Sequence, residues 1–326
     1  MKKQSAMAMC AAVAICVAAE LSASAVAGDA SEKMRVLTYN ILYSGYSSND
    51  VRKLSQWDPH RAWSDRKEDL AKFVRRIDPD VFGLQEACED QVDFFKQKMP
   101  DFGCSGKFRG VEKDGSYMSG SPIYWRKSRF DAGECGTFWL SPTPDKPGSF
   151  GWGSPGPRIC SWQILTDKNT RVRFCFANMH ADHVSAKSKL KSAELVVKRL
   201  EEIAKGMPIV LIGDHNVHES DPPAVLFAKT WRNALYESET HPKGPWRSFN
   251  DWQVKKGEVS AEEAFKTPVE MRVRDRKKFG RRLDYIFVSE GVRVLSYETS
   301  AEMRPSLGLY YSDHFPVFAD IALPKR

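Results

Sequence analysis

The sequence contains little cysteine, no internal repeat and no clear interdomain linker. Its 326 residues include seven cysteines, too few for a disulfide scaffold of this size. No cluster of cysteine and histidine has the spacing of a zinc finger. These absences exclude disulfide-rich, zinc-finger and repeat architectures. On length alone, one large domain or two small ones remain open.

The composition is ordinary for a globular protein and mildly basic. Hydrophobic residues make up 42% and charged residues 28%, which argues against disorder. The formal net charge is +7 and the sequence pI is near 8.9. This balance suits anionic partners such as nucleic acid, phosphoesters or acidic lipid, without requiring any of them.

The N-terminus has the pattern of a secretory signal peptide. Met1-Lys2-Lys3 is positively charged, residues 6–19 are almost all apolar, and small-x-small cleavage patterns follow. This segment is short for a membrane span, although an uncleaved anchor is an alternative. We therefore predict a signal peptide over residues 1–27 and a domain over 28–326. The expected product is secreted or periplasmic, and no membrane span is expected after cleavage.

Export changes the interpretation of the remaining cysteines. The mature chain would keep an odd number of them, so at least one thiol is free or pairs with another chain. Cys160 with Cys175, and Cys104 with Cys135, are two pairings that the sequence leaves open. The five that remain are Cys88, Cys104, Cys135, Cys160 and Cys175.

The rest of the chain alternates strand-like and helical segments. Apolar spacing predicts helices over 63–77, 92–99 and 185–205. The loop 141–157 is rich in proline and glycine, and residues 236–280 are polar and irregular. The many strands and few helices favour layered sheets over a doubly wound parallel sheet. Strands are expected at 35–42, 80–85, 208–213, 283–288, 292–297 and 315–321, with further strand-like runs near 101–109, 117–125, 130–140, 158–166 and 171–178.

Six short segments place polar residues at the ends of apolar strands. Burying carboxylates, imidazoles and amides beside a core costs free energy unless a partner compensates them. A divalent ion held by oxygen ligands is one such partner, and it favours Mg²⁺, with Mn²⁺ or Ca²⁺ as alternatives, over structural zinc. The segments are Thr38-Tyr39-Asn40, Leu84-Gln85-Glu86, Asn178-Met179-His180, Gly213-Asp214-His215-Asn216, Arg282-Leu283-Asp284-Tyr285 and Ser312-Asp313-His314.

In this order, the six segments resemble the endonuclease/exonuclease/phosphatase superfamily, whose fold is that of deoxyribonuclease I. The resemblance runs from about Arg35 to the C-terminus. Phe138-Trp139-Leu140-Ser141, Pro157-Arg158 and Asn178-x-His180 are similar to a bacterial and fungal branch whose substrates are poorly defined. The resemblance implies an α/β fold, a four-layer sandwich of two mixed β-sheets packed face to face with helices outside.

The resemblance also implies roles for single residues. Glu86 is expected to be the main metal ligand, with Asn40 beside it and Asp313 nearby. The expected catalytic residues include a pair that positions the water and phosphate and an Asp–His pair that acts at phosphate. These residues are His180, Asp214, Asn216, Asp284 and His314, and the expected substrate contacts are Arg158, His183, Arg281 and Arg282.

Some residues keep two interpretations. His215 stands where the family usually has phenylalanine; we expect it to pack at a strand end, with metal binding as the alternative. His183 either caps the following helix or acts in the site, and Asp182 is equally open. A basic run at 272–282 is either a solvated loop or an arm that collects phosphate.

The sequence therefore predicts an exported, divalent-metal-dependent phosphoester hydrolase. A phosphodiesterase of the nuclease type is favoured, because a second histidine, His180, accompanies His314. The alternatives are a phosphomonoesterase acting on sugar or inositol phosphates, a sphingomyelinase-like phospholipase C, and a non-catalytic anion-binding module. The expected partner is a phosphoester substrate, with nucleic acid as one candidate, and the expected state is a monomer.

Overall fold

The computed structural model describes residues 33–45, 59–112, 115–254 and 257–325. The predicted signal peptide lies outside these residues. The chain divides into two units, Met1–Lys33 and Met34–Arg326, and the architecture below is that of the second. Among the described residues, no helix has the length and apolar character that crossing a membrane requires.

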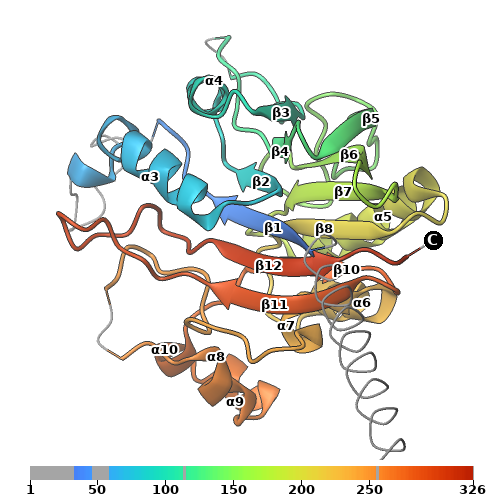
Figure 1. Ribbon diagram of the computed structural model, residues 1–326. Helices are drawn as coiled ribbons and strands as arrows, with labels where there is room; N and C mark the ends of the chain where they lie inside the picture. The colour runs from blue at the N-terminus through green and yellow to red at the C-terminus, as the bar shows by residue number, and fades with distance from the viewer. Residues whose placement is uncertain (1–32, 46–58, 113–114, 255–256, 326) are drawn as a thin grey trace, which may run out of the picture. The chain divides into compact units, whose positions relative to one another are not determined.

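Two six-stranded sheets form the centre of the second unit (Figure 1). Each sheet is mixed, because β1 pairs with β2 and β7 with β8 in parallel, whereas antiparallel pairs surround them. The first sheet has the order β11 (Arg293–Thr299), β12 (Val317–Ala322), β1 (Lys33–Asn40), β2 (Val81–Gln85), β4 (Ile123–Arg126), β3 (Phe102–Ser105). The second has the order β5 (Phe130–Trp139), β6 (Ile159–Asp167), β7 (Arg173–His180), β8 (Ile209–Asp214), β10 (Asp284–Val288), β9 (Arg232–Asn233).

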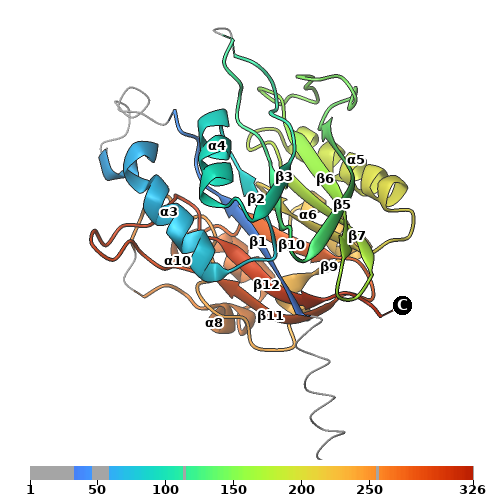
Figure 2. The same cartoon turned by 45° about the horizontal axis from the view of Figure 1, so that its top comes forward.

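Helices cover the outer face of each sheet. Helices α3 (Trp63–Ile77) and α4 (Glu89–Lys98) lie beside the first sheet, and α5 (Ala186–Ala204) and α6 (Pro222–Thr230) beside the second (Figure 2). The remaining helices are short: η1 (Pro59–Arg61), α7 (Ala234–Glu237), α8 (Ala261–Phe265), α9 (Val269–Arg274) and α10 (Arg276–Phe279). Residues 236–280 are thus partly helical, which the sequence did not predict, and α6 was not predicted either.

Three apolar clusters hold these layers together. The first lies between the sheets and joins Val36 of β1 to Phe174 and Phe176 of β7. The second packs α5 and α6 on the second sheet, and the third packs α3 and α4 on the first. The predicted four-layer sandwich of two mixed sheets is therefore confirmed.

The five cysteines of this unit are all free. Cys160 pairs in register with Met179, and Cys175 with Ile164, so the two thiols are not opposite each other on neighbouring strands. Neither of the two pairings that the sequence left open is present.

A buried amide network joins the two sheets. The Asn178 side chain on β7 donates hydrogen bonds to the carbonyl oxygens of Leu84 and Pro122, both 2.9 Å long. Gln85 on β2 donates to Asn178 Oδ1 at 2.7 Å. Gly83 makes this approach feasible, because a Cβ at that position would lie 2.5 Å from Asn178 Cγ. The sheets are therefore held in one relative register by hydrogen bonds as well as by apolar packing.

His215 packs at the end of β8, as predicted from the sequence. Its ring lies edge-on to Phe227 and Tyr285, with centroids 5.1 and 5.5 Å away, and is also close to Phe287. Both ring nitrogens are buried and have no hydrogen-bond partner among the described residues. Burial lowers the pKa of His215 to about 3. The imidazole is therefore neutral, and its unpaired nitrogens cost stability.

We expect His215→Phe to stabilise the protein and to reduce its sensitivity to acid. Between pH 6.5 and about pH 3, His215 is protonated in the unfolded chain but remains neutral in the folded protein. The free energy of unfolding therefore falls as the pH falls. The difference in slope is about 1.4 kcal/mol per pH unit within this window. Urea unfolding of both proteins at a series of pH values measures it, and a variant less stable at pH 7 would contradict the packing interpretation.

Candidate functional site

The polar strand ends predicted from the sequence meet at one edge of both sheets. Parallel pairing places Asn40 opposite Gln85, the residue before Glu86, and places His180 opposite Asp214. Antiparallel pairing places Asp284 opposite Asp214. Strand register therefore brings residues from distant parts of the chain into one site.

A cavity of about 460 Å³ lies at this edge. Asn40 and Asp284 lie behind its wall, where they are buried and hydrogen-bonded to residues that line it. Arg282 does not line it. The predicted site residues that do line it are Glu86, Arg158, His180, His183, Asp214, Asn216, Arg281, Asp313 and His314.

Carboxylates crowd one wall of the cavity. Asn40 Nδ2 donates to Glu86 Oε1 at 3.2 Å and to Asp214 Oδ2 at 3.1 Å. Glu86 has a φ of 62°, in the left-handed region that non-glycine residues rarely adopt. Burial raises the pKa of Asp313, and the charge of Glu86 adds to the rise. A cation beside these oxygens would relieve the repulsion, and such oxygen donors suit a hard divalent ion. Glu86 and Asp313 therefore fit the predicted metal site, whereas Asn40 lies beside them with its amide oxygen accepting the Leu42 backbone N–H at 3.1 Å.

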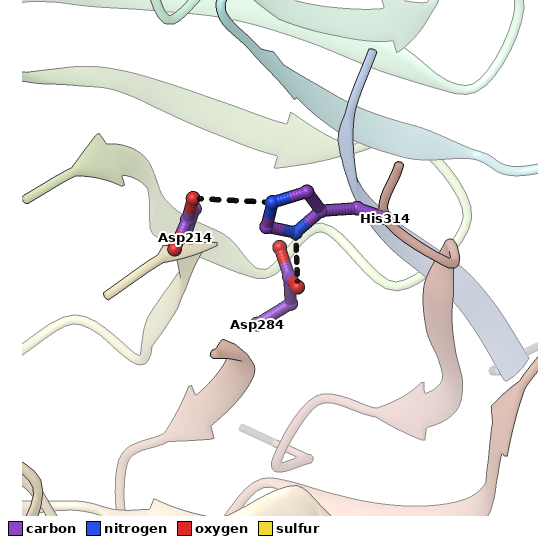
Figure 3. A group of neighbouring side chains, drawn as sticks. All are labelled: Asp214, Asp284 and His314. Carbon is purple, nitrogen blue, oxygen red and sulfur yellow. Dashed lines mark hydrogen bonds and ion pairs between the residues drawn. The ribbon is translucent and has the colours of Figure 1, made fainter. Parts of the chain in front are cut away.

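A histidine links two more carboxylates (Figure 3). His314 Nδ1 lies 2.8 Å from Asp284 Oδ2, and its Nε2 lies 3.8 Å from Asp214 Oδ2. Burial opposes the charge on His314, but Asp284 and Asp214 outweigh it and raise the pKa to about 10. Burial also raises the pKa of Asp214 to about 7, an effect that His314 reduces and Asp284 strengthens. Atoms of the three residues lie within 4.8 Å of one another, a geometry that could also hold a metal ion.

The second histidine, His180, is neutral, whereas His314 is protonated. Arg158 Nη1 lies 3.0 Å from His180 Nε2, and its Nη2 lies 2.8 Å from His183 Nδ1. Arginine can only donate, so both imidazole nitrogens accept and both rings are neutral. Burial, reinforced by the charge of Arg158, lowers the pKa of His180 well below its usual value. The site thus pairs a charged His314 with a neutral His180, which is how one site assigns different proton roles.

Two of the open interpretations are resolved by position. His183 contacts Arg158 in the cavity and does not cap the helix. Asp182 is buried, and its Oδ2 accepts the backbone N–H of Ser185 at 2.7 Å, so it fixes the entry to α5.

Arg109 belongs to the cavity, although the sequence did not point to it. Its backbone N–H donates to the Ser119 carbonyl at 3.1 Å, and its own carbonyl accepts Trp139 Nε1 at 2.7 Å. Arg109 Nε is buried without a hydrogen-bond partner in the described part of the chain. Burial lowers the pKa of Arg158, and the charge of Arg109 lowers it further. Across the described residues, neither arginine has a carboxylate within ion-pair distance.

The basic run at 272–282 separates into structural and exposed residues. Arg282 is buried among aromatic rings and donates to the Tyr297 hydroxyl at 2.9 Å, so the predicted substrate contact is corrected to a core contact. Arg272 is likewise buried and pairs with Glu219 at 2.9 Å. Arg281 lies over the Phe249 ring, 4.1 Å from its centroid, and lines the cavity. The expected phosphate-collecting arm therefore does not include Arg272 or Arg282.

Comparison with known proteins identifies the family. Residues 37–314 match the Endonuclease/Exonuclease/phosphatase family. The chain belongs to this family. Its members are hydrolases that act on phosphoesters.

Two bacterial structures cover this chain closely. The mannosyl-6-phosphatase of Bacteroides thetaiotaomicron is 29% identical, with a TM-score of 0.72, and the match covers 89% of this chain and 100% of that one. An endonuclease/exonuclease/phosphatase structure from Bacteroides vulgatus is 27% identical with the same TM-score, and the match covers 89% and 99%. Carbon catabolite repressor protein 4 homolog 3 of Arabidopsis thaliana is 23% identical over 65% of this chain. The chain spans less than half the length of the curated plant relatives, 46% and 37%.

We expect His314→Ala to lower kcat for phosphoester hydrolysis by about 10²- to 10⁴-fold, because it removes a positive donor aimed at the reacting phosphate. Asp284→Asn should have a smaller effect, because it weakens the charge of His314 without removing the ring. The double variant should be no worse than His314→Ala, since the two residues act as a unit. His241→Ala, an exposed histidine outside the cavity, is the control. If the reductions in kcat of His314→Ala and Asp284→Asn multiply in the double variant, the two residues do not act as a unit.

Proposed function

We propose that this protein is an exported, divalent-metal-dependent phosphoester hydrolase that prefers phosphomonoesters. Export is supported by the signal-like pattern of residues 1–27. Metal dependence is supported by the carboxylate oxygens of Glu86 and Asp313, which are partly buried and line the catalytic cavity. The preference for monoesters rests on one observation: Arg109 and Arg158, neither of which has an ion pair in the described part of the chain, line the same cavity.

The charge of the cavity distinguishes the two phosphoester classes. A phosphomonoester carries close to two negative charges at neutral pH and a phosphodiester carries one. A buried cation without a counter-ion costs free energy that a bound anion recovers. The two arginines therefore favour the dianion. The match to the bacterial mannosyl-6-phosphatase, which covers 89% of this chain and 100% of that one, supports the same choice.

The site contains a group that can accept the proton of the attacking water during hydrolysis. A water oxygen bonds to phosphorus as the bond from phosphorus to the substrate oxygen breaks, in line with it. Asp214, with a pKa of about 7, can accept the water proton. The leaving oxygen keeps the bonding electrons and takes up a proton from solvent, giving an alcohol and hydrogen phosphate. A divalent ion at Glu86 would add Lewis acidity and neutralise developing charge.

His314 and Asn216 hold the reacting groups. His314 stays protonated near neutral pH and can donate a hydrogen bond to a phosphoryl oxygen through Nε2. The Asn216 backbone N–H donates to Asp214 Oδ1 at 3.0 Å and fixes the carboxylate. His180 is neutral and accepts from Arg158, so it orients that arginine toward the phosphate.

A phosphodiesterase of the nuclease type is the second candidate, and one observation favours it. A cavity of about 350 Å³ adjoins the catalytic cavity and shares Phe249 and Arg281 with it. Arg276 also lines this side. A second phosphate of a nucleic acid could bind there by charge. Comparison of monoester and diester substrates separates the two candidates.

We expect Glu86→Gln to weaken the apparent affinity for Mg²⁺ while a high Mg²⁺ concentration partly restores activity. The substitution keeps the shape of the side chain and removes one charged ligand. Titration of activity with Mg²⁺ after EDTA treatment measures the effect, and Glu134→Gln, an exposed residue of β5, is the matched control. An unchanged half-saturating concentration of Mg²⁺ would exclude Glu86 as a ligand.

We expect Arg109→Met to reduce kcat/KM for p-nitrophenyl phosphate by about 10-fold or more, the scale of one charged hydrogen bond. Hydrolysis of bis-p-nitrophenyl phosphate, a diester, should change less. Arg173→Met, exposed at the far end of β7 from His180, is the control. Equal losses on both substrates would show that Arg109 does not select the monoester.

A further inference from the structure

A second cavity, of about 660 Å³, adjoins the catalytic cavity. Four residues line both: Tyr43, Arg109, Met118 and Ser119. The remaining wall of the second cavity contains three carboxylates, Glu89, Asp90 and Glu112, together with Ser116 and Tyr117. We call this cavity the acidic groove.

Two paired segments, 108–112 and 115–120, form one wall of the acidic groove. Met118 donates its backbone N–H to the Gly110 carbonyl at 2.9 Å, and Gly120 donates to the Ala87 carbonyl at 2.7 Å. The rings of Phe108 and Tyr117 stack with centroids 5.1 Å apart. Tyr117 is still 49% exposed. Part of the Tyr117 ring is therefore accessible to a ligand in the groove.

The groove differs in charge from the arginine-lined wall of the catalytic cavity. Arg158 and Arg281 line the catalytic cavity, although Glu86, Asp214 and Asp313 line it as well. In the groove, Glu89, Asp90 and Glu112 form no ion pair with a lysine or arginine in the described chain, and the Ser44 hydroxyl donates to Asp90 Oδ1 at 2.7 Å. Carboxylates accept hydrogen bonds from hydroxyl groups and repel further anions. The groove thus suits a part of the substrate that is uncharged and rich in hydroxyls.

The groove opens directly from the catalytic cavity. Tyr43 and Arg109 line both, and Glu86 Oε2, in the catalytic cavity, accepts the Tyr43 backbone N–H at 3.3 Å. A phosphate bound by Arg109 would lie where the two cavities meet, so the leaving group that it carries could extend into the groove.

We propose that the acidic groove binds the leaving group of the substrate, and that this group is an uncharged polyol such as a sugar. This inference rests on the proposed phosphomonoesterase function and specifies its substrate class. Glu112 would accept hydrogen bonds from sugar hydroxyls, and Tyr117 would offer its ring face to the apolar face of the sugar. Arg109, which lines both cavities, would bind the phosphate at the point where the sugar is attached.

The test compares two monoesters with the same phosphate and different leaving groups. Mannose 6-phosphate has hydroxyls that can reach the groove, and phenyl phosphate has none. We expect Glu112→Gln to raise KM for mannose 6-phosphate by about 10-fold, the scale of one charged hydrogen bond. Tyr117→Ala should also raise this KM, because it removes the ring face. With phenyl phosphate, Glu112→Gln should leave KM within about twofold. Glu134→Gln is the matched control, and the melting temperature of each variant reports on folding.

A charge reversal tests the exclusion of anions. Glu112→Lys should improve kcat/KM for a 5′-phosphorylated oligonucleotide relative to mannose 6-phosphate. Equal changes for all substrates would overturn the proposal. So would an unmodified enzyme that prefers the oligonucleotide, or one that prefers phosphocholine, whose cationic leaving group the carboxylates could also attract.

Binding measurements separate this inference from the proposed function. Isothermal titration with mannose 6-phosphate and with phenyl phosphate needs no turnover. If the sugar phosphate binds more tightly and Glu112→Gln removes the difference, the groove is confirmed even when hydrolysis is absent, and the proposed activity alone fails. If both ligands bind equally to the unmodified protein, the groove assignment is wrong whether or not phosphate is released.

Discussion

The site depends on the buried amide of Asn178. Glu86 and Asn40 come from one sheet, and His180, Asp214 and Asp284 come from the other, so the site exists only if the two sheets keep a fixed offset. Apolar packing alone is non-directional and tolerates small slips. The hydrogen bonds from Asn178 to Leu84 and Pro122, with Gln85 on the amide oxygen, are directional and buried. A displacement would leave these groups unpaired, and this penalty fixes the register from which the site is built.

Above this network, the site is organised by charge. Asp214 and Asp284 lie on paired strands and would repel each other, but the His314 imidazolium between them stabilises both. His180 remains neutral because Arg158 occupies its Nε2. One imidazole is thus protonated between two carboxylates and the other is neutral because it accepts from a guanidinium group, although Asp214 Oδ2 lies 3.5 Å from His180 Nε2 and 3.8 Å from His314 Nε2. Glu86 and Asp313 form no ion pair with a lysine, arginine or histidine in the described part of the chain, and the metal is expected on their side.

The sequence predicted those features that depend on local pattern. Helix α3 begins at Trp63 and ends at Ile77, as its apolar spacing indicated. The polar strand ends converge because strands of one sheet end at a common edge. Helix α6 was missed because its nine residues begin with two prolines and lack an extended amphipathic pattern. Arg281 and Arg282 could not be separated by pattern, since adjacent residues of an extended segment point to opposite sides, one into the cavity and one into the core. Arg109 left no signal, because its position depends on hairpin pairing with residues near 119.

The residues around the site, more than the central catalytic residues, determine substrate specificity. The central carboxylates and histidines serve any phosphoester, whereas the walls come from loops that the core does not constrain. Here the two neighbouring cavities differ in sign: Arg276 and Arg281 line one, and Glu89, Asp90 and Glu112 line the other. A substrate with one phosphate and an uncharged remainder would form hydrogen bonds in the acidic groove and would need no contact with the basic side. A polyanion would instead bind along the basic side. The orientation of the substrate, and with it the choice between sugar phosphate and nucleic acid, therefore follows from the distribution of charge around a common catalytic core.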